Sequence, residues 1–394
     1  IAVGGKKEWV NNTDTSRDTQ NVGADTDPRI KITGADAVYI IERTDRTWDM
    51  CTFDAFKDKQ QYDLLDELKT EITKVADKYT ENGVFNYQKA LESHVKLHRK
   101  EFDSVNFSLD ADEADIALPT ESLKSEQKAD KEVNLAMAER AYYAGRYAQI
   151  CCSGYSAPRL GGMWTGEWNP GWWRSSYTMD ANVNLQVSSM NTGNLTEAPV
   201  GYITFILRQL DDWMENAENT YGMHDAIKTP INTDGDVAIG IESDYNYPHQ
   251  YWNAGASWML LPIYEYWQCY GNQKIPIKDE MRLYENKAAL GIEDGGLSDT
   301  EIKALINRGY LDLEEDILLP LLTKQANFWE QLVTPEYYVD LDGTPHYQKG
   351  KASLNEDERY LIIPSFSSEN HPKRDGKYTW DAQVTMNSTM DISA

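Results

Sequence analysis

Three short polar side chains alternate along the stretch YTMDANVNLQ, residues 177–186: Asp180, Asn182 and Asn184. In an extended chain, residues i, i+2 and i+4 point to the same face, so we expect these three side chains to form one polar row. A buried polar row needs hydrogen-bond partners. The pattern therefore indicates either a structural network or a surface that binds a polar ligand.

The bulk composition narrows the class of ligand. With a formal net charge of −26 over 394 residues, the chain would repel the phosphates of nucleic acids and of an anionic membrane surface, so neither is an expected partner. A neutral ligand is the easier match. The 12 Trp and 24 Tyr side chains offer flat faces on which sugar rings stack, and ordinary core packing is the alternative for most of them.

The sequence predicts no metal and no cofactor. The 4 cysteines form no C-x-x-C motif and Cys151 is adjacent to Cys152, so neither a zinc site nor a disulfide framework is indicated. The loop 232–244, NTDGDVAIGIESD, lacks the spacing of an EF-hand, so a solvated loop competes with a Ca²⁺ site. Its candidate oxygen ligands are Asp234, Asp236, Glu242 and Asp244.

No apolar run is long enough to span a bilayer.

Hydrophobic periodicity predicts the elements that position these residues. Strand-like runs occur at 29–32, 37–44 and 105–110, and the polar segment 110–130 is typical of a linker. Helices are expected at 58–78, 86–102, 133–150, 200–217, 255–270 and 311–333, with shorter ones within 278–296 and 298–310. The segment 255–270 is apolar almost all round, which predicts a buried helix.

Long helices joined by long aromatic loops after residue 131 suggest an α/α toroid. Fewer helices are predicted there than a closed toroid requires, and an open one would leave apolar faces uncovered. We therefore expect the remainder of the barrel to be supplied by further residues of the same polypeptide. The sequence is therefore expected to be part of a longer protein.

Residues 145–195 carry a resemblance to a known family: GRYAQICCSGYSAPRLGGMWTGEWNPGWWRSSYTMDANVNLQVSSMNTGNL. This segment resembles the opening of the catalytic domain of glycoside hydrolase family 95, which contains α-L-fucosidases and α-L-galactosidases. The family pattern there is G-R-Y-L, L-Q-G-x-W, P-x-W, N-x-N and N-L. Counting back from Asn194 aligns Asp180-Ala181-Asn182 with N-x-N.

Three later segments are similar to further motifs of the same family, in the same order. INTD (231–234) resembles H-N-T-D, and YWNAGASWMLLPIYEYW (251–267) resembles a W-x-x-G-x-A-W-L helix. IIPSFSSEN (362–370) resembles P-S-x-S-P-E-N, in which the Glu is the family's general acid.

The resemblance implies a mainly α protein with an (α/α)6 toroid, incomplete in this chain, preceded by part of a β-sandwich domain and a helical linker. The implied domains are residues 1–109 for the C-terminal part of the β-sandwich with its helical elements, 110–132 for the linker and 133–394 for the first part of the barrel. The family is inverting, so the implied function is removal of terminal α-L-fucosyl or α-L-galactosyl residues from glycans. A secreted, extracellular or cell-surface location is expected for such an enzyme.

The resemblance also implies roles for individual residues. Glu369 would be the general acid, with Asn370 beside it at the substrate, and the general base would lie beyond Ala394. Asn182 and Asp180 would hold the attacking water, and Asp180, which replaces the family's first Asn, would assist or partly take over the base role. Capping of a turn is the alternative for Asp180.

Thr178 stands where fucosidases of the family commonly carry a His that packs at C6 of the sugar. Its smaller side chain would leave space for the C6 hydroxyl that L-galactose has and L-fucose lacks, which favours an α-L-galactosidase. Candidate stacking platforms for the sugar are Trp164, Trp168, Trp172, Trp173 and Trp252. Two other functions stay open: a non-catalytic glycan-binding relative and an inverting sugar phosphorylase.

Overall fold

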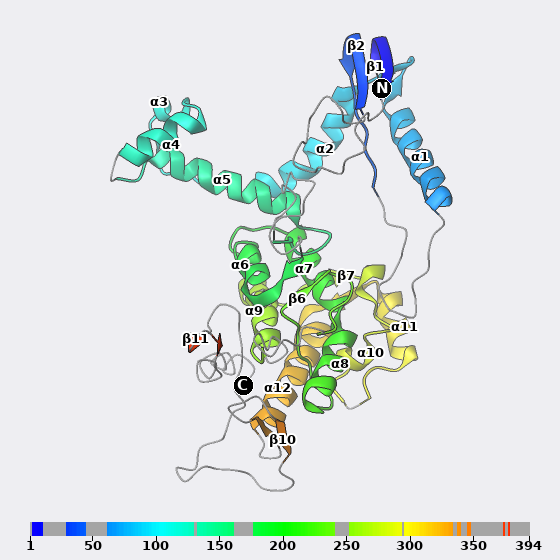
Figure 1. Cartoon of the computed structure of the whole chain (residues 1–394), viewed down its shortest axis with the longest axis vertical. Coiled ribbons are helices and arrows are strands. Elements are labelled where there is room, and N and C mark those ends of the chain that lie inside the picture. Colours follow the sequence, from blue (N-terminus) through cyan, green and yellow to red (C-terminus); the bar gives the residue numbers. More distant parts are fainter. Residues whose placement is uncertain are drawn as a thin grey trace. The chain divides into compact units, whose positions relative to one another are not determined.

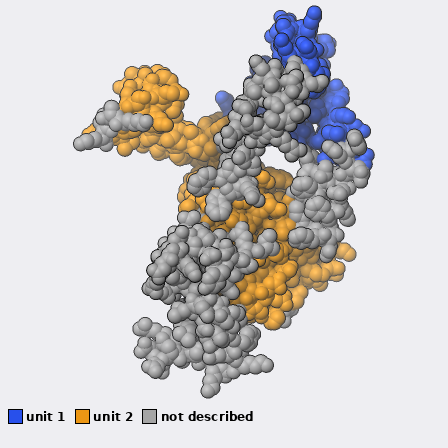
Figure 2. Space-filling model, in the orientation of Figure 1, with its two compact units in different colours: residues 1–100, 165–171 blue, residues 101–164, 172–394 orange. Residues whose placement is uncertain are grey.

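The computed structural model describes residues 2–10, 29–44, 61–129, 132–160, 176–240, 252–293, 295–333, 337–339, 345–347, 373–374 and 377–378. The chain divides into two compact units, which Figure 2 colours separately. Residues 1–100 belong to the first unit, and the described residues after 100 belong to the second.

The first unit combines a two-stranded sheet with two helices (Figure 1). Strands β1 (Ala2–Val10) and β2 (Arg29–Val38) pair antiparallel, with a bulge between Val3 and Gly4. Helix α1 (Gln61–Lys78) is followed by the short pair β3 (Thr80–Glu81) and β4 (Val84–Phe85), and then by α2 (Tyr87–Phe102). Both predicted helices are confirmed, whereas the strand predicted at 37–44 ends at Val38.

The segment between α2 and the next long helix differs from its prediction. Residues 105–110 form no strand, because their backbone groups bond to side chains: the Tyr143 hydroxyl accepts from Phe107 N at 2.8 Å, and the Glu139 carboxylate accepts from Leu109 N at 2.5 Å. The expected linker contains two helices, α3 (Glu113–Ile116) and α4 (Thr120–Ala129). Helix α5 (Leu135–Cys152) then follows, capped by the Asn134 side chain.

The core of the second unit is helical. It contains α6 (Asn184–Val187), α7 (Glu197–Leu207), α8 (Leu210–Tyr221), α9 (Gly255–Tyr270), α10 (Lys287–Leu290), α11 (Asp299–Arg308) and α12 (Leu319–Val333). Its short sheets are β5 (Tyr177–Thr178) with β6 (Asn232–Thr233), and β7 (Lys274–Pro276) with β8 (Tyr310–Asp312). Further two-stranded pairs are β9 (Tyr337–Val339) with β10 (Pro345–Tyr347), and β11 (Lys373–Arg374) with β12 (Lys377–Tyr378).

Helix α9 confirms the prediction of a buried helix at 255–270. Its neighbours include α12, where the indole Nε1 of Trp329 donates to Ser257 Oγ at 3.1 Å (Figure 1). A large apolar cluster contains side chains of α7, α9 and the turn before α12, among them Phe205, Met259 and Leu313. This cluster is the structural support of the segments described below.

Two other predicted helices are interrupted. The helix predicted at 200–217 breaks between Leu207 and Leu210, where Gln209 has φ −120° and ψ 6° and its side chain bonds back to the carbonyl of Phe205. The apolar periodicity continues across the break because both halves face the core. The helix predicted at 311–333 begins instead with strand β8 and a π-helical turn, Leu313–Leu318, and becomes α-helical at Leu319.

The mainly α character of the fold is confirmed. Each sheet among the described residues has two strands, so the β-sandwich remains a prediction. The (α/α)6 toroid also remains a prediction. None of the described helices is both long and apolar enough to cross a bilayer.

Candidate functional site

Strands β5 and β6 bring together two motifs that lie far apart in the sequence. Tyr177 is the register partner of Thr233, and Thr178 is the register partner of Asn232. The backbone N–H of Met179 donates to the carbonyl of Ile231 at 2.7 Å and continues the pairing by one residue. The segments YTMD and INTD, which carried separate parts of the family resemblance, are therefore neighbours.

The side chains of this pair alternate between two faces. Tyr177 and Met179 belong to the apolar core, and Tyr177 packs against Phe205 with ring centroids 4.7 Å apart. Thr178 lies on the opposite face of the pair. Asp180 follows two residues later, with φ −95° and ψ 99°. Both are buried, at 6% and 2% exposure, and Asp180 interacts with a neighbouring group.

The predicted polar row ends at Asp180. Met179–Val183 forms a π-helical turn in which Asp180 alone has non-helical dihedral angles, and α6 follows at Asn184. Helical spacing then places Val183 and Val187 in the core. The prediction that Asp180, Asn182 and Asn184 share one face of an extended chain is wrong, because the chain turns into a helix to bury these valines.

Asn184 has a structural contact. Its Nδ2 donates to the carbonyl of Trp258 in α9 at 2.7 Å, and the residue is 7% exposed. This bond ties the start of α6 to α9. Asn182 is partly buried in the turn before it.

Several buried polar atoms around β5 and β6 have no hydrogen-bond partner among the residues that the structure describes. They are Thr178 Oγ1, Asn232 Oδ1, Thr229 Oγ1 and Trp252 Nε1. An unsatisfied buried donor or acceptor costs about 1–3 kcal/mol, so native structures contain few of them. Other buried atoms of the described residues are unsatisfied too, among them atoms of Arg208 and Gln325. Thr178 and Asn232 differ from these in being register partners, so they are the candidate contacts for a polar ligand.

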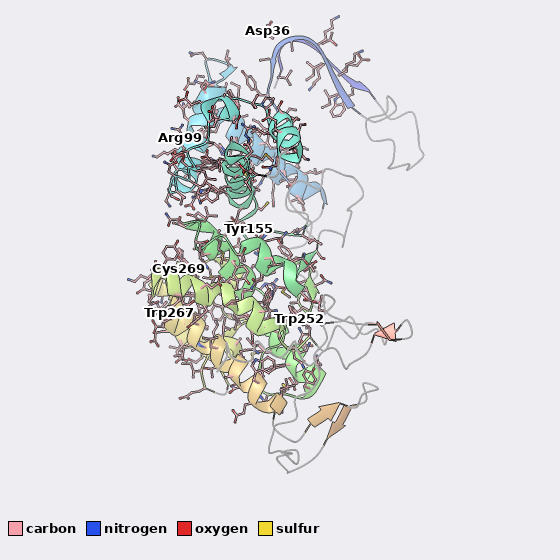
Figure 3. All side chains as sticks on the ribbon, turned by 90° about the vertical axis from the view of Figure 1, so that its left-hand side faces the viewer. Asp36, Arg99, Tyr155, Trp252, Trp267 and Cys269 are labelled. Carbon is pink, nitrogen blue, oxygen red and sulfur yellow. The ribbon has the colours of Figure 1, made fainter. Side chains whose placement is uncertain are left out.

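Trp252 lies in the core before α9, towards the opposite end of that helix from Trp267 (Figure 3). A Cβ on Gly255 would lie 2.6 Å from the Trp252 ring and 2.2 Å from Thr229 Oγ1, so glycine is required for this close approach. The indole is 2% exposed. Because the ring is buried and its Nε1 is one of the unsatisfied atoms, the group of Trp252 that can contact a ligand is its N–H.

The acidic loop after β6 is ordered by its own contacts. Asp234 Oδ1 accepts from the backbone N–H groups of Asp236 at 2.8 Å and Val237 at 2.9 Å. Asp236 forms an ion pair with Arg208. Glu242 and Asp244 lie outside the described residues, and the described part of the chain contains no group of three His, Cys, Asp or Glu placed to hold a metal.

Two ionisable groups beside this loop were not found by sequence reasoning. Burial raises the pKa of Asp212 to about 6, although its carboxylate accepts from Ala238 N at 2.6 Å. Burial also lowers the pKa of Lys228 to about 7. Asn216 joins the two regions by donating to the carbonyls of Lys228 and Ala238. Nothing in the local sequence signals either shift, because both arise from desolvation by distant elements.

The other predicted site residues are not described by the structure. Glu369, Asn370, Trp164, Trp168, Trp172 and Trp173 all lie outside the described residues. Of the predicted site, the structure describes Thr178, Asp180, Asn182 and Trp252. It places Asn232 beside Thr178.

Comparison with known proteins identifies one family. The model of the glycosyl hydrolase family 95 catalytic domain matches residues 86–284, about half of the chain. The match includes β5 and β6, and it ends before Glu369. No curated protein and no solved structure matches the chain.

Proposed function

Because the chain belongs to glycoside hydrolase family 95, we propose that it removes terminal α-L-fucosyl or α-L-galactosyl residues from glycans with inversion at the anomeric carbon. The observation that carries this proposal is the family match over 86–284, which contains the paired segments YTMD and INTD. A catalytic domain of this family implies a carbohydrate substrate.

Inversion requires two groups on opposite faces of the sugar ring. One carboxylic acid protonates the leaving oxygen, while a base activates water about 6.5–9.5 Å away. We assign the acid role to Glu369 on its resemblance to the family's P-S-x-S-P-E-N motif. An acid in this role needs a pKa raised towards neutrality so that it holds the proton that it donates.

Asp180 and Asn182 are the proposed water-holding residues. Asp180, in the turn directly after β5, is 2% exposed, which supports its place in a site rather than on a solvated turn. A carboxylate polarises water more strongly than the amide that it replaces, so Asp180 would assist the base or share its role.

Thr178 supports a preference for α-L-galactosides. Its side chain is smaller than the His of related fucosidases and has an unpartnered hydroxyl. A site that hydrogen-bonds a substrate hydroxyl discriminates far more strongly than one that only leaves room for it.

A location outside the cell remains part of the proposal.

A phosphorylase is the second candidate, and Arg208 is the observation that favours it. Arg208 is 6% exposed, and its Nη1 donates hydrogen bonds to the carbonyl of Gly235 and to Oδ1 of Asp236. Its Nε and Nη2 have no hydrogen-bond partner within the described ranges. These two atoms form the edge of the guanidinium that binds two oxygens of a phosphate. A net charge of −26 disfavours phosphate, so hydrolysis is the leading proposal.

Aryl α-L-fucoside and α-L-galactoside, followed by NMR with and without inorganic phosphate, test the alternatives. Inverting hydrolysis releases the free β-sugar first and does not depend on phosphate. A sugar 1-phosphate that appears only with phosphate would establish the phosphorylase instead. Binding of the glycosides without either product would establish a glycan-binding relative.

A further inference from the structure

The two faces of the β5–β6 pair differ in how their polar groups are satisfied. On the core face, Thr233 Oγ1 donates to the carbonyl of Val237 at 2.6 Å, and the Tyr177 hydroxyl donates to Ser156 Oγ at 3.3 Å. On the other face, Thr178 Oγ1 and Asn232 Oδ1 are buried and have no hydrogen-bond partner in the described part of the chain. The same short pair of strands therefore has one satisfied face and one unsatisfied face.

Thr178 and Asn232 lie directly opposite each other. As register partners in an antiparallel pair, their side chains leave the sheet on the same face, with Cβ atoms about 4.5–5.5 Å apart. The two unpartnered oxygens are thus close enough for one small group to contact both.

We propose that Thr178 and Asn232 together bind a single hydroxyl group of the sugar. The Thr178 hydroxyl donates to the sugar oxygen, and the sugar hydroxyl donates its proton to Asn232 Oδ1. This inference rests on the proposed function, because it assigns a sugar to the site. It makes Asn232 a specificity-determining residue that no motif in the sequence singled out for this role.

The chemistry of the two oxygens selects a hydroxyl over other ligands. Asn232 Oδ1 can only accept a hydrogen bond, and a threonine hydroxyl can both donate and accept. A phosphate oxygen would face this acceptor and the nearby Asp180 with no proton to give. A metal cation would need more oxygen ligands, and the described residues contain no cluster of three metal-binding side chains. An alcohol group, with one donor and one acceptor, satisfies both atoms.

Binding measurements test the inference without depending on turnover. Methyl α-L-galactoside and its four monodeoxy analogues, of which the 6-deoxy compound is methyl α-L-fucoside, are titrated by ligand-observed NMR into the whole chain. The variants are Asn232→Leu, which removes the acceptor, Asn232→Asp, which keeps it, and Thr178→Val. Asn272→Leu is the matched control, since Asn272 is exposed and its Oδ1 accepts from Glu314 N.

The expected pattern is specific to one hydroxyl. Wild-type protein binds one deoxy analogue about tenfold or more weakly than the parent sugar. Asn232→Leu lowers the affinity for the parent to that of this analogue and leaves the affinity for the analogue itself unchanged. Asn232→Asp and the control retain discrimination. Combining Thr178→Val with Asn232→Leu costs less than the sum of the single changes, because both act on the same hydroxyl.

Other outcomes separate this inference from the proposed function. Equal weakening of all five sugars by Asn232→Leu, or no weakening, overturns the inference while the glycosidase assignment stands. If wild-type protein binds none of the five, the sugar class is wrong and the inference fails with it. A circular-dichroism melt of each variant excludes loss of folding as the cause of lost affinity.

Discussion

Arg208 and Asp236 form a buried ion pair between the end of α7 and the loop after β6. Arg208 Nη1 lies 3.3 Å from Asp236 Oδ1, and both side chains are 7% exposed. Arg282 strengthens this junction by donating to the backbone carbonyls of Arg208 and Asp236. These contacts attach the loop after β6 to the helical core.

Removing one member of this pair is expected to destabilise the fold. Asp236→Ala leaves the Arg208 charge buried with less compensation, and such changes cost about 3–5 kcal/mol. Urea denaturation followed by tryptophan fluorescence measures the free energy of unfolding. The control is Asp66→Ala, because Asp66 pairs with Lys69 at 78% and 72% exposure, where about 0–1 kcal/mol is expected. A loss at Asp236 no larger than at Asp66 would show that the pair does not hold the loop.

Asp180→Asn tests the role of the carboxylate in the reaction. If Asp180 helps to deprotonate the attacking water, the substitution lowers kcat for the aryl glycosides about a hundredfold or more, with little change in binding of the sugar. The amide keeps the size of the side chain, so the thermal unfolding midpoint serves as the folding control. Retention of the full rate contradicts the proposed role and leaves Asp180 as a structural residue.

Asp212 is expected to make stability depend on pH in the acidic range. Burial raises the pKa of its carboxyl from 3.8 to about 6, so the folded chain holds this proton more tightly than the unfolded chain does. The resulting stabilisation is complete below about pH 4 and is lost as the pH rises through about 6. In urea denaturation at several pH values, Asp212→Asn removes this component. Parallel pH profiles of the variant and the wild type would refute the assignment.

Lys228 is expected to act in the opposite direction at higher pH. Burial lowers the pKa of its amine from 10.5 to about 7, so between these values the unfolded chain binds a proton that the folded chain does not. The free energy of unfolding should therefore rise with pH across this range. Lys228→Met is expected to flatten the rise and to stabilise the protein at and below pH 7. A variant that is less stable than wild type at pH 6 would show that the folded protein accommodates the charged amine.

Local sequence patterns predicted the helices well. The apolar segment 255–270 corresponds to α9 in full, and the periodic segments before residue 103 correspond to α1 and α2. Hydrophobic periodicity is a property of neighbouring residues, so it can be observed without the fold. The break between α7 and α8 was missed because the same periodicity continues through it, whereas the Arg208 side chain beside the break bonds to the carbonyl of Gly235, a group that only the fold brings near.

The candidate site could be predicted only in part. The sequence by itself determined the family resemblance, which the family match confirmed, and it singled out Thr178 and Asp180 as site residues. Only the tertiary structure decided that Asn232 faces Thr178 and that the polar row stops at Asp180. It also buries Asp212 and Lys228, which raises the pKa of the first and lowers the pKa of the second. Strand pairing and desolvation depend on which distant segments are brought into contact, and that information is not contained in any local stretch of the chain.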